Sequence, residues 1–142
     1  MRLSAREQTG LRVMIALAQA YGEGPVPLRA VSEQQHLPLA YLEQVVGRLR
    51  RAGLLASVRG SHGGYYLTRE PSQVLISQVI VALEGQLLTL DCLAHGPGAC
   101  EYVGGCAARG VWLQVQESLE RTLAHMTLAD VLQTAGQDEE NQ

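Results

Sequence analysis

Apolar residues recur at three- and four-residue steps in the first part of the chain, which is the spacing of an amphipathic helix. A helix is predicted from Ser4 to about Tyr21, because Ser4 is a suitable N-cap and Glu7 stands three residues later, as a capping box requires. The glycines and prolines of 22–27 end this helix. A second, shorter helix is predicted over residues 29–35.

A third helix is predicted after the turn at 36–39, and it continues to Ala52, where Gly53 can cap its C-terminus. Its apolar and polar positions fall on opposite sides, so one face is expected to pack on the core and the other to face solvent or a partner. The inner face holds Leu42, Val45, Val46 and Leu49, and the outer face holds Tyr41, Glu43, Gln44, Gly47, Arg48, Arg50 and Arg51.

Two short segments with strand composition follow, at 54–58 and 65–67, on either side of a glycine-rich tip that begins with Arg59. Two short helices, a tight turn and a hairpin with a basic tip predict a winged helix-turn-helix. In that architecture the third helix enters the major groove of DNA, and Arg59 is expected at the minor groove or the backbone, where the negative potential is strongest. The alternative is a protein-docking module, since helix-turn-helix units also have that role.

The distribution of charge favours DNA over protein docking. The net charge is −3, but residues 1–70 hold nine Arg against five Glu, a balance of +4, and residues 71–142 hold a balance of −7. The N-terminal half is therefore expected to carry the anion-facing surface. No apolar run approaches the roughly 18 residues that a membrane span needs, so a soluble protein is expected.

The C-terminal half is predicted to contain two more helices and a terminal turn. The first, over 71–85, is apolar on most sides and is expected to be buried; the second, over 107–125, carries a single apolar stripe. Because the chain has no further core to cover that stripe, it is interpreted as a dimerisation helix, the alternative being ordinary packing within one chain. The stripe comprises Val111, Trp112, Val115, Leu119 and Leu123. An amphipathic turn is expected over 127–132.

All three cysteines of the chain lie within fifteen residues, as Cys92-x7-Cys100-x5-Cys106 on a glycine-rich segment. Three thiols cannot all pair as disulfides, and the N-terminus lacks the pattern of a cleavable leader, so a reducing cytoplasm is expected. Clustered thiolates in that compartment usually bind a soft metal or an iron–sulfur cluster. Three unrelated thiols, a redox pair with a spare thiol, and a zinc site are the alternatives, although neither interval is the CxxC of a zinc knuckle.

No grouping of side chains predicts an enzyme. The four histidines, which are the usual general bases, fall in four separate predicted elements. The predicted fold class is therefore mainly α with a small β-hairpin, as a winged helix-turn-helix plus a long C-terminal dimerisation helix. Residues 1–70 form the DNA-binding domain, 71–135 hold the buried helix, the metal-binding loop (91–106) and the dimerisation helix, and 136–142 are expected to be a disordered tail.

Several motifs resemble the Rrf-type bacterial transcription regulators, in unbroken order over about residues 1–133. They are Met1-Arg2-Leu3-Ser4, 24–28, Tyr41-Leu42-Glu43-Gln44, the wing Val58-Arg59-Gly60-x-x-Gly63-Gly64-Tyr65, the three cysteines and 127–131. The resemblance is greatest to the members that bind an iron–sulfur cluster. It implies a homodimer on a palindromic double-stranded DNA operator, with a cluster, [2Fe–2S] rather than [4Fe–4S], that controls operator recognition. It also implies metal ligands at Cys92, Cys100 and Cys106, recognition-helix contacts from Tyr41, Glu43 and Gln44, and a wing contact from Arg59.

The fourth ligand of such a cluster stays open, because this sequence departs from the family pattern. Arg109 stands where some members have a histidine, and Gln8, beside Glu7, stands where a nitric-oxide-sensing branch has an acid. His95, Glu7 or Gln8 of a partner subunit, and a small exogenous ligand are the candidates. A nitric-oxide or redox sensor of the same fold is the alternative function. Pro38 and Ala40 replace serines that contact the operator in relatives, so a different operator preference is expected.

Overall fold

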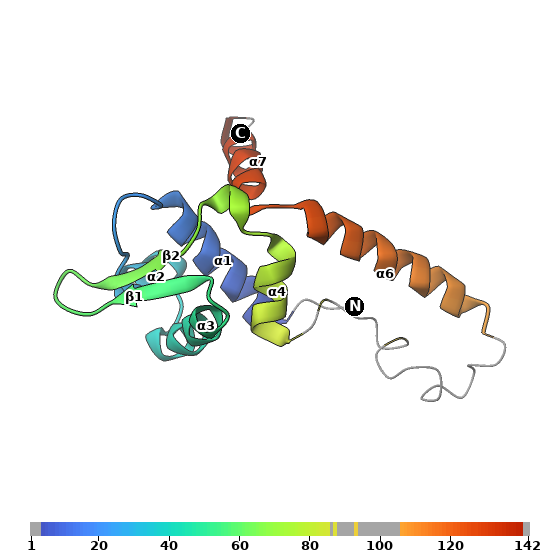
Figure 1. Cartoon of the computed structure of the whole chain (residues 1–142), viewed down its shortest axis with the longest axis horizontal. Helices are drawn as coiled ribbons and strands as arrows, with labels where there is room; N and C mark the ends of the chain where they lie inside the picture. The colour runs from blue at the N-terminus through green and yellow to red at the C-terminus, as the bar shows by residue number, and fades with distance from the viewer. Residues whose placement is uncertain (1–3, 86, 88–92, 94–105, 141–142) are drawn as a thin grey trace.

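The computed structural model describes residues 4–85, 87, 93 and 106–140 as a helical body with a two-stranded wing and a projecting helical arm (Figure 1). The predicted fold class is confirmed. The elements are α1 (Ala5–Gln19), α2 (Leu28–Gln35), α3 (Leu39–Arg51), β1 (Leu55–Val58), β2 (Gly64–Leu67), a short 3-10 helix η1 (Pro71–Gln73), α4 (Ile76–Glu84), α6 (Ala108–His125) and α7 (Leu128–Glu140).

The body is built around one apolar core to which the helices α1, α2, α3, α4 and α7 and the hairpin all contribute. Met14, Leu49, Leu83 and Leu128, which come from α1, α3, α4 and α7 respectively, are fully buried. Burial of apolar surface is the main favourable term in folding, so the two ends of the chain stabilise the same unit. The body therefore includes α7 as well as the predicted DNA-binding domain.

The wing is an antiparallel hairpin in which Leu55 pairs with Leu67 and Val58 with Gly64. A second backbone pairing holds β2 near the tip end of the hairpin, where Val26 and Tyr65 exchange two hydrogen bonds of 2.8 Å. A side chain at Gly64 would collide with the backbone of Val26, so glycine is required at this crossing. The hairpin is thus attached to the connection between α1 and α2 and points away from the body (Figure 1).

The predicted fourth helix was placed too early in the sequence. Pro71–Gln73 form only a 3-10 turn, Val74 and Leu75 are extended, and α4 begins at Ile76. The extended pair makes a bridge to the start of α7, in which Leu128 N donates to Val74 O and Ile76 N donates to Met126 O, each at 2.9 Å. A pairing partner about fifty residues away in sequence, which local periodicity cannot reveal, decides the local conformation here.

The C-terminal end is more helical than predicted. The expected turn over 127–132 is the first part of α7, which continues to Glu140 through much of the segment expected to be disordered. Thr127 and Asp130 start the helix as a reciprocal cap, with Thr127 N donating to Asp130 Oδ2 at 2.9 Å and Asp130 N donating to Thr127 Oγ1 at 3.2 Å. The following residues include no proline, and most of them are good helix formers.

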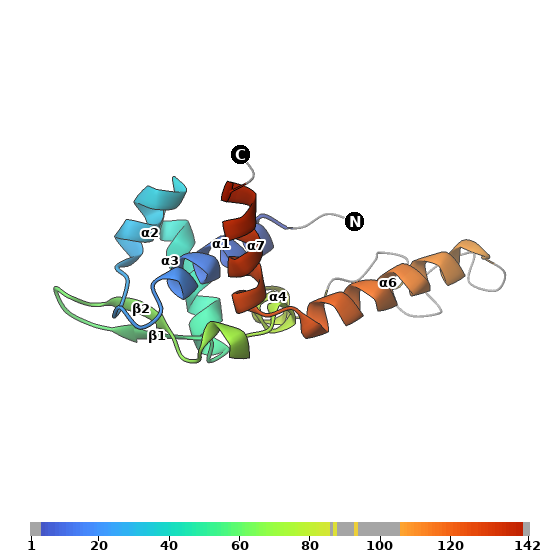
Figure 2. The same ribbon diagram turned by 90° about the horizontal axis from the view of Figure 1, so that it is seen from above.

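Helix α6 extends away from the body as an arm, as both ribbon views show (Figures 1 and 2). Only its C-terminal end adjoins the body, and α7 then turns back against α1 and η1. Among the helices in the described part of the chain, none combines the length and the hydrophobicity that crossing a bilayer needs.

Candidate DNA-binding surface and cysteine segment

Helix α3 divides its side chains between the core and the outside as the sequence predicted. Leu42, Val45, Val46 and Leu49 are buried, whereas Glu43 and Gln44 are exposed. Tyr41 is half-buried and packs partly on the core, so its ring is anchored while part of it stays accessible. The helix therefore presents a firmly supported polar surface, as a reading helix needs.

The three predicted base-reading residues belong to one surface. Tyr41, Glu43 and Gln44 line a hollow of about 540 Å³ whose other walls come from the start of α1 and the end of α4. Arg48 and Arg51, one and two turns further along α3, line the same hollow. The polar face of α3 and its arginines are thus continuous, which suits contact with base edges beside phosphates.

The turn between α2 and α3 is held by side-chain and backbone bonds. His36 adopts the left-handed conformation at φ 54°, and no other described residue except glycine has a positive φ. Ser32 secures both sides of this turn, because its carbonyl accepts from Leu37 N at 3.1 Å and its hydroxyl donates to Leu37 O at 2.5 Å. This fixed angle between α2 and α3 defines a helix-turn-helix.

The wing presents a basic tip on a separate element. Arg59 and His62 are exposed at the tip, and Gly63 N donates to Gly60 O at 3.0 Å to close the turn. A side chain at Gly63 would collide with the backbone of Val58. Arg59 is therefore carried on a tight, glycine-dependent turn and not on the helix that holds Tyr41, Glu43 and Gln44.

Of the predicted metal ligands, the structure describes only Cys106. It is a free, exposed thiol just before α6, and its carbonyl accepts from Arg109 N at 3.2 Å. Cys92 and Cys100 lie outside the described residues, as does the candidate fourth ligand His95. No three His, Cys, Asp or Glu side chains gather into a metal site among the residues that the structure does describe.

Glu7, another candidate for the fourth ligand, already has a role within its own protomer. Its carboxylate accepts from Ser4 N at 2.7 Å, and Glu7 N donates to the Ser4 hydroxyl at 3.0 Å. This confirms the capping box predicted from the sequence. Since Glu7 is only 4% exposed, it can coordinate a metal only if the start of α1 rearranges. The neighbouring Gln8 is exposed.

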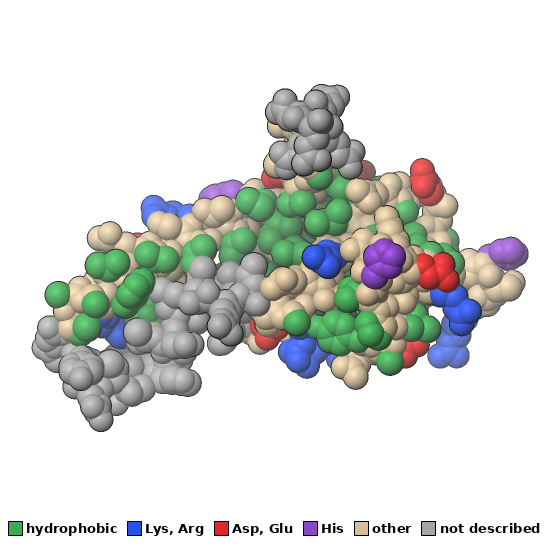
Figure 3. Space-filling view, turned by 180° about the vertical axis from the view of Figure 1, so that it is seen from behind, with side chains coloured by type: hydrophobic (Ala, Val, Ile, Leu, Met, Phe, Trp, Pro, Cys, Tyr) green, Lys and Arg blue, Asp and Glu red, His purple; other side chains and the backbone are tan. Residues whose placement is uncertain are grey.

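The apolar stripe of α6 is largely uncovered. Figure 3 shows hydrophobic side chains gathered over the arm, where Val111, Trp112, Leu113 and Val115 are 55%, 40%, 42% and 37% exposed. Gln116 is the buried residue of this helix, and it donates to Glu120 at 3.1 Å. A contiguous apolar surface of this kind is characteristic of a protein interface. The prediction had omitted Leu113, which lies beside the stripe.

One set of contacts was missed by the sequence prediction. Arg48, assigned to the outer face of α3, donates to the carbonyl of Leu83 at the end of α4 at 3.2 Å. Nothing in the spacing of apolar residues points to a bond between positions so far apart in the sequence. Only the packing of α3 against α4 brings them together.

A helix-turn-helix with a supported polar helix and a basic wing defines a DNA-binding transcription regulator. The chain belongs to the Rrf2 family: the family pattern, described as that of an iron-dependent transcriptional regulator, matches residues 3–134. The protein is accordingly a regulator and not an enzyme.

Relatives of two kinds match more than nine-tenths of this chain. The HTH-type transcriptional regulator CymR of Bacillus subtilis is 34% identical over 92% of this chain and 89% of its own. IscR of Serratia proteamaculans is 36% identical over 93% of this chain and 79% of its own. Among solved structures, B. subtilis CymR, described as the global cysteine regulator, superimposes with a TM-score of 0.79 at 34% identity, over 92% of this chain and 95% of its own. IscR of T. potens superimposes with a TM-score of 0.76 at 39% identity, over 95% and 88%.

Proposed function

We propose that this protein is a homodimeric, cytoplasmic transcription regulator whose operator binding responds to an iron–sulfur cluster held by Cys92, Cys100 and Cys106. The observation that carries the proposal is the exposed, free Cys106 thiol beside an uncovered apolar helix, with the other two cysteines in the fourteen residues before it. Soft thiolate donors suit iron–sulfur clusters. The similarity to IscR proteins supports the same function, although the CymR proteins are similar to nearly the same degree.

The donor set suits a sensor. A cluster, proposed as [2Fe–2S] rather than [4Fe–4S], supplies a group that is lost or attacked when iron–sulfur supply falls or an oxidant appears. With three cysteines, one ligand position must be filled by another group, and such a ligand generally binds iron less firmly. If loaded and unloaded dimers hold α3 differently, a differential stabilisation of about 1–3 kcal/mol gives a 5- to 150-fold change in operator affinity.

The cluster is tested by the absorption spectrum and metal content of anaerobically purified protein. Cys92→Ala, Cys100→Ala and Cys106→Ala are each expected to abolish the visible absorbance and to leave a folded dimer. A full iron–sulfur spectrum in any of these variants would remove that cysteine from the ligand set. Stoichiometric zinc without visible absorbance would support the zinc-bound alternative, and loss of the spectrum on treatment with nitric oxide alone would support the nitric-oxide sensor.

The fourth ligand is tested by comparing His95→Ala with Glu7→Gln. The Gln side chain keeps an oxygen that can accept from Ser4 N, so Glu7→Gln removes the carboxylate and preserves the cap. If His95 is the ligand, His95→Ala shifts the spectrum and hastens cluster loss, and the redox potential of the wild type varies with pH, because protonation competes with iron. The reverse pattern would assign the ligand to Glu7 of the partner subunit.

The DNA contacts are tested on the wing and on α3. Arg59→Ala is expected to weaken operator binding by about 1–3 kcal/mol and to reduce the salt slope by about one unit. Arg121→Ala, which removes the same charge from the exposed outer side of α6, is the control and should change neither quantity. An unchanged salt slope in Arg59→Ala would contradict the proposed phosphate or minor-groove contact.

Glu43 is proposed as a filter of base sequence, together with contacts from Tyr41 and Gln44. An acidic side chain near phosphates costs affinity, and it excludes sequences that cannot offer it a hydrogen-bond donor. Glu43→Ala is therefore expected to widen the set of operators that the protein binds in a library selection. Unchanged selectivity would remove this role from Glu43.

A further inference from the structure

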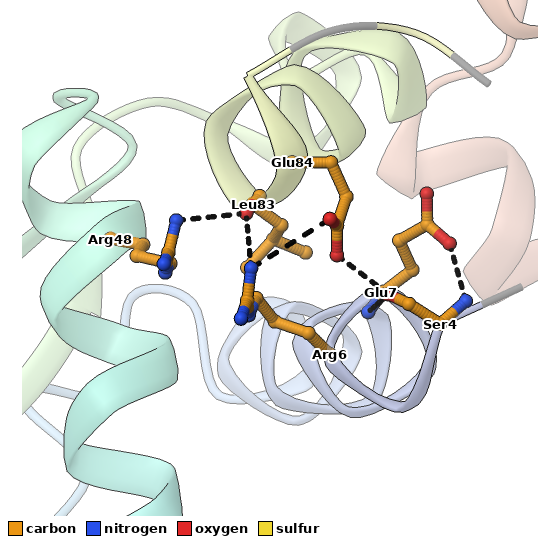
Figure 4. Close-up of polar contacts among 6 residues, drawn as sticks. All are labelled: Ser4, Arg6, Glu7, Arg48, Leu83 and Glu84. Carbon is orange, nitrogen blue, oxygen red and sulfur yellow. Dashed lines mark hydrogen bonds and ion pairs between the residues drawn. The ribbon is translucent and has the colours of Figure 1, made fainter. Parts of the chain in front are cut away.

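The end of α4 is fastened to two other helices by a connected set of polar contacts (Figure 4). The Leu83 carbonyl accepts from Arg48 of α3 at 3.2 Å and from Arg6 of α1 at 3.5 Å. The next residue, Glu84, accepts from the Ser4 hydroxyl at 2.6 Å, and its second oxygen lies 3.7 Å from Arg6. Arg6 therefore contacts both residues at the end of α4.

These contacts suit the electrostatics of a helix end. The last turn of a helix has carbonyls without intrahelical donors and carries a partial negative charge, so guanidinium groups are favourable there. Arg48 is half-buried, which protects its hydrogen bond from competition with water. The two arginines and Leu83 are called the α4 clamp below.

The side chain of Leu83 also holds the end of α4 in place, by packing in the core. It is fully buried and packs directly on Gly10 of α1, where an added Cβ would overlap it. The α4 end can therefore move little relative to α1 without disturbing the core, because close-packed interiors resist small shifts. A displacement of the α4 end would therefore disturb its neighbours, and the Arg48 hydrogen bond joins that end to α3.

The two ends of this connection are functionally different. Gly85, with φ 80°, ends α4, and the chain then enters the segment that contains all three cysteines. At the other end, Arg48 belongs to the same helix and lines the same hollow as Tyr41, Glu43 and Gln44. The α4 clamp is thus a described polar contact between the helix that leads into the cysteine segment and the helix proposed to read DNA.

We propose that Arg48, supported by Arg6, is a positioning residue that sets the orientation of α3 according to the state of the cysteine segment. Binding of a group to that segment changes the preferred position of the α4 end. The α4 clamp transmits this change to the base-reading face of α3. This proposed coupling between the cysteine segment and α3 rests on the proposed function, because it assumes that the cysteines bind a cluster. The clamp itself rests only on the described contacts.

The decisive measurement is the ratio of operator dissociation constants for unloaded and cluster-loaded protein, using a duplex selected from a random library by the wild type. Arg48→Ala is expected to bring this ratio from the wild-type value, about 5- to 150-fold, to near one. Arg51→Ala is the matched control, since Arg51 lies on the same helix and makes no hydrogen bond or ion pair within the described part of the chain. It should weaken both forms alike and leave the ratio unchanged.

Arg6→Ala tests the clamp from outside α3. It removes no side chain from the reading helix, so a reduced ratio in this variant cannot come from a lost α3 contact to DNA. The ratio is expected to fall part of the way, because Arg48 still holds Leu83. Wild-type ratios in both Arg48→Ala and Arg6→Ala, with the cluster spectrum intact, would overturn the proposal. If Arg48→Ala does not fold, a wild-type ratio in Arg6→Ala alone overturns it.

Amide hydrogen exchange on unloaded protein separates failure of the clamp from failure of the proposed function. Arg48→Ala should speed exchange in the last turns of α3 and α4, and Arg51→Ala should not. If the wild type binds no cluster, the proposed function fails while this result still supports the clamp. Unchanged exchange in Arg48→Ala overturns the clamp whatever the cysteines bind.

Discussion

The body and the α6 arm use helices of similar length in opposite ways. Helix α1 buries seven of its fifteen residues and packs against α3, α4, α7 and the wing, whereas α6 buries only Gln116 out of eighteen. Yet both helices have an amphipathic sequence, so the pattern alone does not say what covers the apolar side. The body closes a core within one chain, whereas the apolar side of the arm is left largely exposed.

The two regions should therefore differ in the kind of stability that their residues determine. Substitutions in the body should change the free energy of folding of each protomer. Substitutions on the arm should instead change the association of two protomers, whose apparent stability depends on protein concentration.

The largest effect is expected from a charge in the arm stripe. Val115→Glu would place an unpaired carboxylate in the proposed dimer interface, at a cost of about 3–5 kcal/mol, or roughly a hundredfold or more in the dimer dissociation constant. Gln114→Glu, the same new side chain one position earlier on the exposed outer side, is the control. Sedimentation equilibrium distinguishes the two variants. A Val115→Glu protein that stays dimeric would show that the interface lies elsewhere.

The next largest effect concerns the core of the body. Val79 and Val81 are the same residue type on α4, but Val79 is fully buried and Val81 is 42% exposed. Val79→Ala should lower the free energy of unfolding by about 2–3 kcal/mol, because it removes buried methyl groups and leaves a cavity. Val81→Ala should cost well under ~1 kcal/mol. Chemical denaturation at several protein concentrations measures both, and equal losses would mean that Val81 is covered in the dimer.

Two glycine-to-alanine substitutions test the same difference between the body and the arm. Gly10→Ala drives a methyl group into buried Leu83, which should cost about 1–3 kcal/mol and be offset by up to ~1 kcal/mol of helix propensity. Gly110→Ala on the arm meets no neighbour among the residues that the structure describes, so it should gain that propensity without a clash. Thermal unfolding should therefore shift in opposite directions. Destabilisation by Gly110→Ala would indicate close approach of the partner subunit there.

The smallest effect is expected where the arm returns to the body. The hydrogen bonds from the backbone and side chain of Thr127 hold the pKa of Asp130 below its ordinary value. A lowered folded-state pKa stabilises the protein above the ordinary value, and this contribution is lost as the pH falls through the folded pKa. Asp130→Asn should therefore lower the melting temperature slightly at neutral pH and make no difference in strong acid. A constant difference across the acid range would contradict this assignment.

The sequence predicted those parts of the structure whose cause is local. The capping box of Ser4 and Glu7, the inner face of α3 and the wing are set by neighbours a few residues away, and all three are as predicted. Of the candidate site, the outward position of Glu43 and Gln44 follows from the same helical spacing.

The features that sequence reasoning missed depend on distant partners. The late start of α4 results from pairing with the start of α7, and the bond from Arg48 to Leu83 results from packing between helices. Likewise, the spacing of Glu7 indicated a cap, but only the burial of its side chain shows how firmly that carboxylate is held. Neither periodicity nor composition contains this information.

The bridge between Leu75 and Thr127 has a consequence for how the chain can change. It closes a loop of residues 76–126, in which α4 packs in the body and the chain then returns to the body at the end of α6. The cysteine segment and the arm thus form an insertion between two parts of one folding unit. Loop-closure entropy rises slowly with length, by about 0.6 kcal/mol per doubling. The insertion can therefore lengthen, shorten or exchange its ligands with little cost to the DNA-reading fold, which makes the sensor a replaceable module.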